Sequence, residues 1–254
     1  MELEIWQFAL LFAAAFFSGF VDAICGGGGM ITIPALLAVG VAPHAALATN
    51  KFQASFGSFT AAANFALKGY VDFKEIILGV IFTLLGAAFG TFIVLLIDSK
   101  FLNYIIPFLL LALLVYMIFS PNLGQEERTP KLDAKLFYVV FGFLLGFYDG
   151  FFGPGTGSFW TFALVGVLGL YMKKAVAHTK VFNFTSNIVS LIVFIIGGQI
   201  LWFVGAVMAV GQVLGGYVGS NMVIKKEVKF VRKILLVVVG ATILKLLYGL
   251  FFGA

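Results

Sequence analysis

The sequence is dominated by eight stretches of about 20 mostly apolar residues, each long enough to cross the hydrocarbon layer of a membrane as a helix. They are residues 5–24, 45–67, 76–97, 101–119, 136–152, 175–197, 203–224 and 234–252. Two shorter apolar pieces, 30–41 and 158–170, each follow a glycine cluster and would reach only about 18 Å as helices. Open sheet edges cannot face lipid, and the long stretches exceed the length of barrel strands, so we expect helices throughout.

The composition supports an integral membrane protein. Hydrophobic residues make up 62% of the 254 positions and charged residues 11%, whereas soluble domains contain about 45–50% and about 25%. So few charges cannot cover a water-soluble globule, which excludes a soluble enzyme, a nucleic-acid-binding protein and a disordered chain. The net charge of +5 comes from basic residues in short connectors, as membrane topology requires. We therefore expect an all-α polytopic membrane protein whose surroundings are the lipid bilayer.

The two halves of the sequence match each other. A shift of 127 residues, which becomes 129 after an insertion of two, aligns Asp22 with Asp149, Gly26 with Gly153, Gly28 with Gly155, Lys51 with Lys180, Gly86 with Gly215 and Gly90 with Gly219. Matched Asp, Lys and Gly positions indicate an internal duplication. We expect a first repeat over 1–119 with its glycine-rich turn at 26–29, a polar linker over 120–135, and a second repeat over 136–254 with its turn at 153–157.

The basic residues of the connectors predict how the repeats are oriented. If each glycine cluster only kinks a helix, the repeats are parallel and the connector cations divide eight to five between the two sides. If the first helix and its short partner form a hairpin, the repeats are inverted, and twelve cations face one side with only Lys100 on the other. Cytoplasmic connectors are rich in Lys and Arg, so we expect inverted repeats with both termini outside the cytoplasm. Two full crossings in place of each hairpin would give the same division.

The glycine clusters are the first candidate binding elements. One reads Gly26-Gly27-Gly28-Gly29 and the other Gly153-Pro154-Gly155-Thr156-Gly157. Glycine costs about 1 kcal/mol relative to alanine in a helix, and unwound backbone survives within a membrane only where it is buried or lines a polar cavity. A short helix starting after each cluster would present free N–H groups and a positive dipole end to an anion. The alternative is close helix packing, which we expect for the Gly-x3-Gly pairs at 86/90, 142/146 and 215/219.

Four charged side chains lie within or beside these apolar stretches. Lys51 and Lys180 are about six residues inside theirs, where a buried ammonium indicates function. They would supply positive charge to an anion, reach the headgroups, or pair with Asp22 and Asp149, which stand four residues before the clusters. The aspartates would couple transport to protons or neutralise the lysines. Further polar side chains would line the same cavity or join helices: Gln53, Ser55, Ser58, Asn64, Asn183, Ser186 and Asn187.

Other features argue against other functions. A single cysteine, Cys25, excludes an intramolecular disulfide and an all-Cys metal site. His44 and His178 do not occupy matching positions of the repeats and do not make a metal site by themselves. We find no nucleophile paired with a base and no nucleotide-binding loop, which argues against an enzyme. We expect no metal and no cofactor.

The sequence resembles the sulfite exporter TauE/SafE family over nearly its whole length. The resemblance rests on Gly26–Gly29 with Pro34 downstream, on Thr49-Asn50-Lys51, and on a weaker copy in Gly153–Gly157 and Thr179-Lys180. It implies a transporter of the bacterial cytoplasmic membrane for small, often sulfur-containing anions such as sulfite or sulfonates. Pro154 and Thr156 stand where the first turn has glycines, and Thr161 stands where it has Pro34, so the two turns need not contact substrate equally.

We expect a secondary transporter that exports a small anion by alternating access through a site built from both turns. The expected substrate-binding residues are Gly26, Gly27, Gly28, Gly29, Asn50, Lys51, Gly153, Gly155, Thr156, Gly157, Thr179 and Lys180, with Asp22 and Asp149 for proton coupling or lysine pairing. An anion channel would use the same elements but show flux without saturation, and a membrane sulfur-relay protein would depend on Cys25. The sequence leaves open the anion, the coupling ion and the oligomeric state, including a homo-oligomer.

Overall fold

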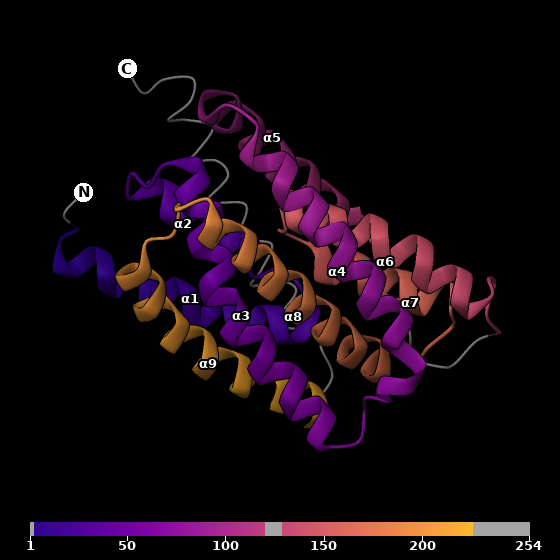
Figure 1. Ribbon diagram of the computed structural model, residues 1–254. Helices are drawn as coiled ribbons and strands as arrows, with labels where there is room; N and C mark the ends of the chain where they lie inside the picture. The colour runs from indigo at the N-terminus through magenta and orange to yellow at the C-terminus, as the bar shows by residue number, and fades with distance from the viewer. Residues whose placement is uncertain (1–2, 120–128, 226–254) are drawn as a thin grey trace.

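The computed structural model describes residues 3–119 and 129–225, which form helices joined by short connectors (Figure 1). The long helices are α1 (Ile5–Cys25), α3 (Pro43–Leu67), α4 (Phe73–Leu95), α5 (Ser99–Phe119), α6 (Ala134–Phe151), α8 (Met172–Ile196) and α9 (Trp202–Lys225). The two short ones are α2 (Gly29–Ala38) and α7 (Thr156–Gly166). The eighth expected stretch, 234–252, lies outside the described residues. Within the described ranges, the prediction of an all-helical fold is confirmed.

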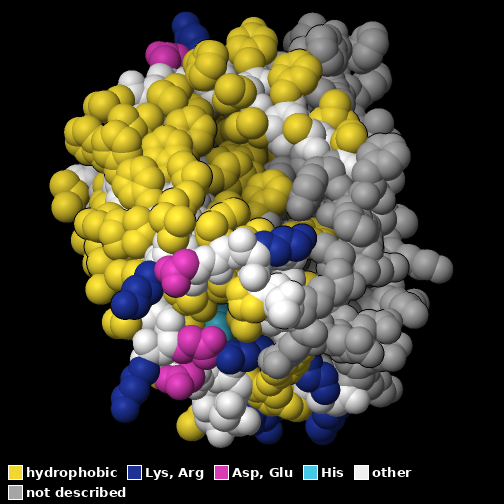
Figure 2. Space-filling view, turned by 90° about the vertical axis from the view of Figure 1, so that its right-hand side faces the viewer, with side chains coloured by type: hydrophobic (Ala, Val, Ile, Leu, Met, Phe, Trp, Pro, Cys, Tyr) yellow, Lys and Arg dark blue, Asp and Glu magenta, His cyan; other side chains and the backbone are white. Residues whose placement is uncertain are grey.

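The distribution of side chains is that of a protein embedded in lipid. Among the described helices, α1, α4, α6, α8 and α9 are long and apolar enough to cross a membrane. Large side chains such as Phe89 and Phe203 are more than half exposed, and Figure 2 shows a broad apolar surface with charges gathered toward one end. The interior carries polar groups, including Lys51 and Lys180, which are at most 1% exposed. An apolar exterior around a polar interior fits a multi-pass membrane protein.

The long apolar stretches break where local sequence signals require it. Pro43 occupies the first turn of α3, where its missing N–H removes no helical hydrogen bond. Asp72 and Asp133 cap α4 and α6 by accepting backbone N–H groups of their first turns. Gly69 and Gly198 have φ values of +76° and +67° just after α3 and α8, the left-handed conformation that ends a helix.

Glycine faces hold helices from one half of the chain against helices from the other. The most extensive helix contacts join α1 to α9 and α4 to α6. A Cβ on Gly215 would lie 2.8 Å from Phe20 N, and a Cβ on Gly90 would lie 2.8 Å from Phe151 N. Because no larger residue allows such an approach, the expectation that the Gly-x3-Gly pairs are packing faces is confirmed.

The contacts between α3 and α8 fix the relative direction of these helices. Near the start of α3, Thr49 Oγ1 accepts the N–H of Leu201, which follows α8 (3.1 Å). Beyond the end of α3, Glu75 forms an ion pair with Lys174 at the start of α8 (2.8 Å). The two helices, which also pack along each other, therefore run antiparallel.

Candidate functional site

The chain between α1 and α2 turns sharply at the first glycine cluster. Gly26 has φ +68°, and its N–H donates to Asp22 O at 2.9 Å, which closes α1. Leu36 of α2 packs in one apolar cluster with Leu11 of α1, so α2 folds back along α1. The 10 residues of α2 extend about 15 Å, roughly half the hydrocarbon layer. The first turn therefore joins a long helix to a half-helix.

The second cluster forms a similar turn between α6 and α7 with different side chains. Gly153 and Gly155 have φ values of +96° and +80°, which favour glycine at both positions. Thr156 begins α7 and donates its hydroxyl to Gly153 O at 2.7 Å. The Tyr148 hydroxyl donates to Pro154 O at 2.7 Å, which ties the turn to α6. Pro154 and Thr156 therefore stiffen a turn that the first half builds from glycines.

The two turns touch backbone to backbone. Ser158 Oγ donates to Gly26 O at 2.6 Å. A Cβ on Gly26 would lie 2.6 Å from Ser158 N, and a Cβ on Gly157 would lie 2.6 Å from Gly26 Cα. Neither position admits a side chain, so Gly26 and Gly157 serve the contact between the turns. The remaining glycines of both clusters are left to line the space beside this contact.

Each buried lysine forms an ion pair with the aspartate of the other half. Lys51 Nζ lies 2.7 Å from Asp149 Oδ1 and donates to Asp149 O at 2.5 Å. Lys180 Nζ lies 3.0 Å from Asp22 Oδ2 and also donates to Asp22 O. Both lysine side chains are 1% exposed. In the structure both lysines therefore pair with aspartates, and the pairs join the two halves beside the turns.

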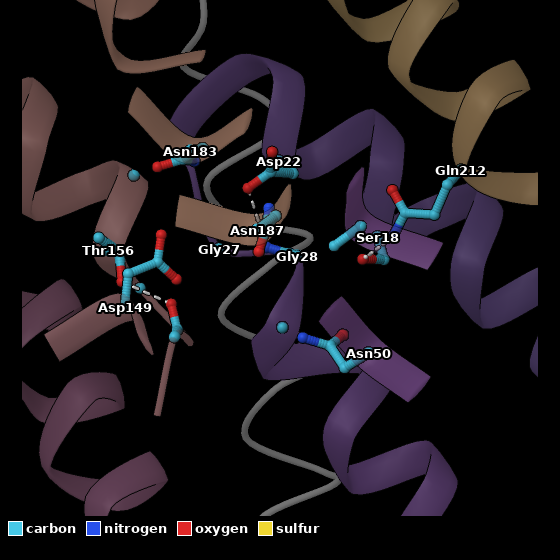
Figure 3. Close-up of a pocket in the computed structure, with 15 residues that line it drawn as sticks. Ser18, Asp22, Gly27, Gly28, Asn50, Asp149, Thr156, Asn183, Asn187 and Gln212 are labelled. Carbon is cyan, nitrogen blue, oxygen red and sulfur yellow. Dashed lines mark hydrogen bonds between the residues drawn. The ribbon is translucent and has the colours of Figure 1, made fainter. Parts of the chain in front are cut away.

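A small cavity lies where the turns and pairs meet (Figure 3). Its volume of about 30 Å³ has room for about two water molecules or one small ion. It is lined by Ser18, Asp22, Gly27, Gly28, Gly29, Asn50, Ala54, Asp149, Gly153, Gly155, Thr156, Gly157, Asn183, Asn187 and Gln212. Of the expected site residues, only Gly26, Lys51, Thr179 and Lys180 do not line it. The two lysines do not line the cavity themselves, but each forms an ion pair with an aspartate that does.

Asn50 presents a hydrogen-bond donor to this cavity. Its Oδ1 accepts the hydroxyl of Thr32 on α2 at 2.6 Å and the Nε2 of Gln53 at 2.8 Å. These two donors fix the orientation of the amide, because only its oxygen accepts hydrogen bonds. Within the described residues Nδ2 has no acceptor, and Figure 3 shows it directed toward the other lining groups. Asn50 therefore offers N–H groups to whatever occupies the cavity.

Three lining residues were not predicted from the sequence: Ser18, Ala54 and Gln212. Gln212 Nε2 donates to Ser18 Oγ at 2.9 Å, which leaves the Ser18 hydroxyl hydrogen for another acceptor. Gln212 is a polar side chain within an apolar stretch, and this signal could have identified it. Ser18 carries no such signal, because single serines are common in membrane helices. Asn183, which was predicted, has its Oδ1 buried without a partner among the described residues.

The other polar candidates serve structural contacts. Thr179 Oγ1 lies 3.2 Å from Thr161 Oγ1, and Asn64 Nδ2 donates to Ser220 Oγ at 2.8 Å. Ser55 donates to a carbonyl of its own helix. The side chain of Cys25 lies outside the described part of the chain. Within the described residues, no three His, Cys, Asp or Glu side chains gather closely enough to hold a metal ion.

Comparison with known proteins identifies the family of the chain. The sulfite exporter TauE/SafE family matches residues 11–246. A "probable membrane transporter protein" of Haemophilus influenzae is 44% identical over 248 residues, which cover 98% of this chain and 97% of that protein. The "probable membrane transporter protein YfcA" of Escherichia coli K12 is 41% identical over 239 residues, covering 94% and 89%. A "probable membrane transporter protein ORF9" of Sinorhizobium is 41% identical over 246 residues, covering 97% and 94%.

The family match spans the helices that carry both turns, both lysines and both aspartates. These relatives match 98% and 94% of this chain, so the similarity extends beyond the apolar character that any two membrane helices share. The chain therefore belongs to the sulfite exporter TauE/SafE family of membrane transporters.

Proposed function

We propose that the protein is a secondary transporter that exports a small anion, of the sulfur-containing kind such as sulfite or a sulfonate, by alternating access. The observation that carries the proposal is the donor-lined cavity between the two glycine turns. Asn50 Nδ2, the Ser18 hydroxyl and the backbone N–H groups of Gly29 and Gly157, at the starts of α2 and α7, are the donors that an oxyanion needs. The sulfur-containing class follows from the family's description, and the size of the cavity favours an ion of few atoms.

An inverted duplication provides the two faces of such a transporter. Three observations support it. The matched helices α3 and α8 run antiparallel, α1 packs along α9 while its counterpart α6 packs along α4, and each lysine pairs with the aspartate of the other half. The repeats are 1–119 and 136–254, joined by the linker 120–135, and the cavity lies on their common boundary.

The charged connectors support the orientation in the membrane. The Glu75–Lys174 ion pair joins the first turn of α4 to the start of α8, and Lys173 Nζ donates to Ile224 O near the end of α9. The start of α4, the start of α8 and the end of α9, each of which carries a lysine, therefore lie at one end of the molecule, as inverted repeats require. That end faces the cytoplasm of a bacterial inner membrane, which leaves both termini outside.

The way the turns are held supports alternating access. Each half contributes one turn, one lysine and one aspartate, so rocking one half against the other opens the cavity to one side at a time. The cavity is smaller than a sulfonate, so the structure corresponds to a compact state that must open to load a larger anion. The lysines contribute positive charge close to the cavity, where each is paired with an aspartate that lines it.

Flux and binding screens test this function directly. Purified protein is screened by thermal shift against sulfite, thiosulfate, sulfoacetate, taurine and simple carboxylates, and then reconstituted for flux with and without a pH gradient. We expect stabilisation by a small oxyanion and saturable flux of the same ion. Flux that rises linearly with concentration would indicate a channel instead, and no response to any anion would contradict the proposal.

A further inference from the structure

The two lysine–aspartate pairs are alike in chemistry but are not held equally. Asp149 accepts Lys51 at one carboxylate oxygen and the hydroxyl of Ser186 at the other, and its side chain is 6% exposed. Within the described residues, Asp22 accepts Lys180 at 3.0 Å and otherwise only the distant N–H of Gly28 at 3.5 Å, and its side chain is 22% exposed. Asp149 is therefore fixed on both oxygens, whereas one oxygen of Asp22 is almost free.

The duplication explains why only one pair is reinforced. The shift of 129 that relates Lys51 to Lys180 also relates Gly57 to Ser186. Where Asp149 has a serine hydroxyl, the position that would support Asp22 has a glycine without a side chain. Gly57 is instead packed against Gln212, with a Cβ on it 3.2 Å from Gln212 Cδ. The loss of one hydroxyl therefore leaves Asp22 as the weaker-held carboxylate of the cavity.

The charges around Asp22 sum to zero. Lys180 faces it directly, and Asp149 with its partner Lys51 stands across the cavity. Several helices pack against α1. Two of them, α2 and α7, contain no titratable residue, and the only charged residue of α9 is Lys225 at its last position. In α3, His44 lies nearer the start of the helix than Lys51. In α8, three titratable residues lie nearer the start than Lys180: Lys173, Lys174 and His178. Two lysines and two aspartates therefore define the charge of the cavity.

A bound monoanion would leave this buried group with one uncompensated negative charge. Such a charge inside a membrane protein is costly unless a partner neutralises it. The lysines are already paired, so a further positive charge must arrive with the anion. A proton is the one cation that needs no additional ligands, because a carboxylate oxygen accepts it directly.

We infer that each monoanion is bound together with one proton, which goes to the carboxylate of Asp22. The protonated Asp22 no longer neutralises Lys180, whose ammonium keeps its own protons and turns its charge to the anion. Anion and proton enter together, so the charge of the cavity is unchanged and transport of a monoanion is electrically neutral. Export then proceeds when the ratio of cytoplasmic to external anion concentration is larger than the ratio of external to cytoplasmic proton concentration, which opposes it.

This inference rests on the proposed function, and proton uptake on binding tests it. Methanesulfonate, which stays ionised at neutral pH, is added to purified protein in weakly buffered detergent while pH and bound anion are measured. We expect about one proton taken up per anion, and affinity that rises about tenfold for each unit fall in pH. Asp22→Asn, which mimics the protonated carboxyl, binds the anion without proton uptake and without pH dependence. Asp22→Glu retains both.

The controls separate this inference from the transport proposal. Asp98→Asn removes an exposed carboxylate outside the cavity and keeps the proton uptake of the unmodified protein. Anion binding without proton uptake in the unmodified protein would overturn the inference and leave the proposed function intact. Undiminished uptake in Asp22→Asn, or its loss in Asp149→Asn alone, would also overturn it. Absence of binding by every anion tested would contradict the proposed function itself.

Discussion

Gly157, at the start of α7, lies against Gly26, at the end of α1, so closely that a Cβ on it would be 2.6 Å from the other glycine's Cα. These positions belong to different halves of the chain, and their contact holds the two turns together. The cavity lies beside this contact and depends on it for its shape.

Gly157→Ala is therefore expected to push the turns apart. The added methyl group has no room, so we expect a fall in thermal stability and loss of anion binding. Gly166→Ala is the matched control, because it lies at the other end of α7 and a Cβ there meets nothing within 4 Å. Melting temperatures of both variants in detergent check the prediction. Equal stability of the two variants would contradict it.

Removing one partner of a buried pair should destabilise the protein unequally at the two sites. Lys51→Met leaves Asp149 charged and buried, and we expect a loss of about 3–5 kcal/mol. Lys180→Met should cost less, because Asp22 is 22% exposed and water reaches it. Unfolding in denaturant measures the free energy of unfolding of both variants. The double variant Lys51→Met with Asp149→Asn should recover most of the stability lost in Lys51→Met. A larger cost for Lys180→Met would refute the ranking.

Asn50 should determine anion affinity. Asn50→Asp replaces the Nδ2 donor with a carboxylate oxygen, and loss of a hydrogen bond to an anion predicts weakening of about tenfold or more. Thr32→Val removes one of the two donors that orient Asn50, so affinity should fall about threefold to tenfold. Thr161→Val is the control, since Thr161 bonds Thr179 and neither lines the cavity. Calorimetric titration checks all three, and an effect of Thr161→Val as large as that of Thr32→Val would count against Asn50.

Membrane orientation can be checked in intact cells. In a Cys25→Ser background, single cysteines replace Lys74, Lys173 and Lys100. Inverted repeats predict that an impermeant thiol reagent added outside labels only the position of Lys100. Parallel repeats would place Lys100 and Lys173 on one side and Lys74 on the other, so labelling of the Lys74 position alone would instead indicate parallel repeats.

Much of the site was predictable because its residues are anomalous in an apolar chain. Charged residues and glycine runs within membrane-spanning stretches carry an energetic cost, so Lys51, Asp149 and the two clusters stand out from the sequence alone. Which aspartate pairs with which lysine was not predictable, because this depends on which helix of one half packs on which helix of the other. The sequence therefore named the four charged residues without assigning each lysine to its aspartate.

The inequality of the pairs required coordinates. An alignment of the halves reveals that Gly57 matches Ser186, yet it does not reveal that this hydroxyl reaches Asp149. The same holds for Ser18, whose contact with Gln212 joins helices far apart in the sequence. Contacts of this kind depend on three-dimensional packing, which residue type and spacing do not specify.

The most direct test of the account is counterflow of labelled sulfite in proteoliposomes that contain either the unmodified protein or Ala54→Leu. Ala54 lines the cavity, so a leucine there should fill it, whereas Ala13→Leu on the exposed side of α1 serves as the matched control. The account predicts saturable counterflow by the unmodified protein and Ala13→Leu, and none by Ala54→Leu in a protein of unchanged fold. Equal counterflow by all three proteins would contradict a substrate site between the two glycine turns.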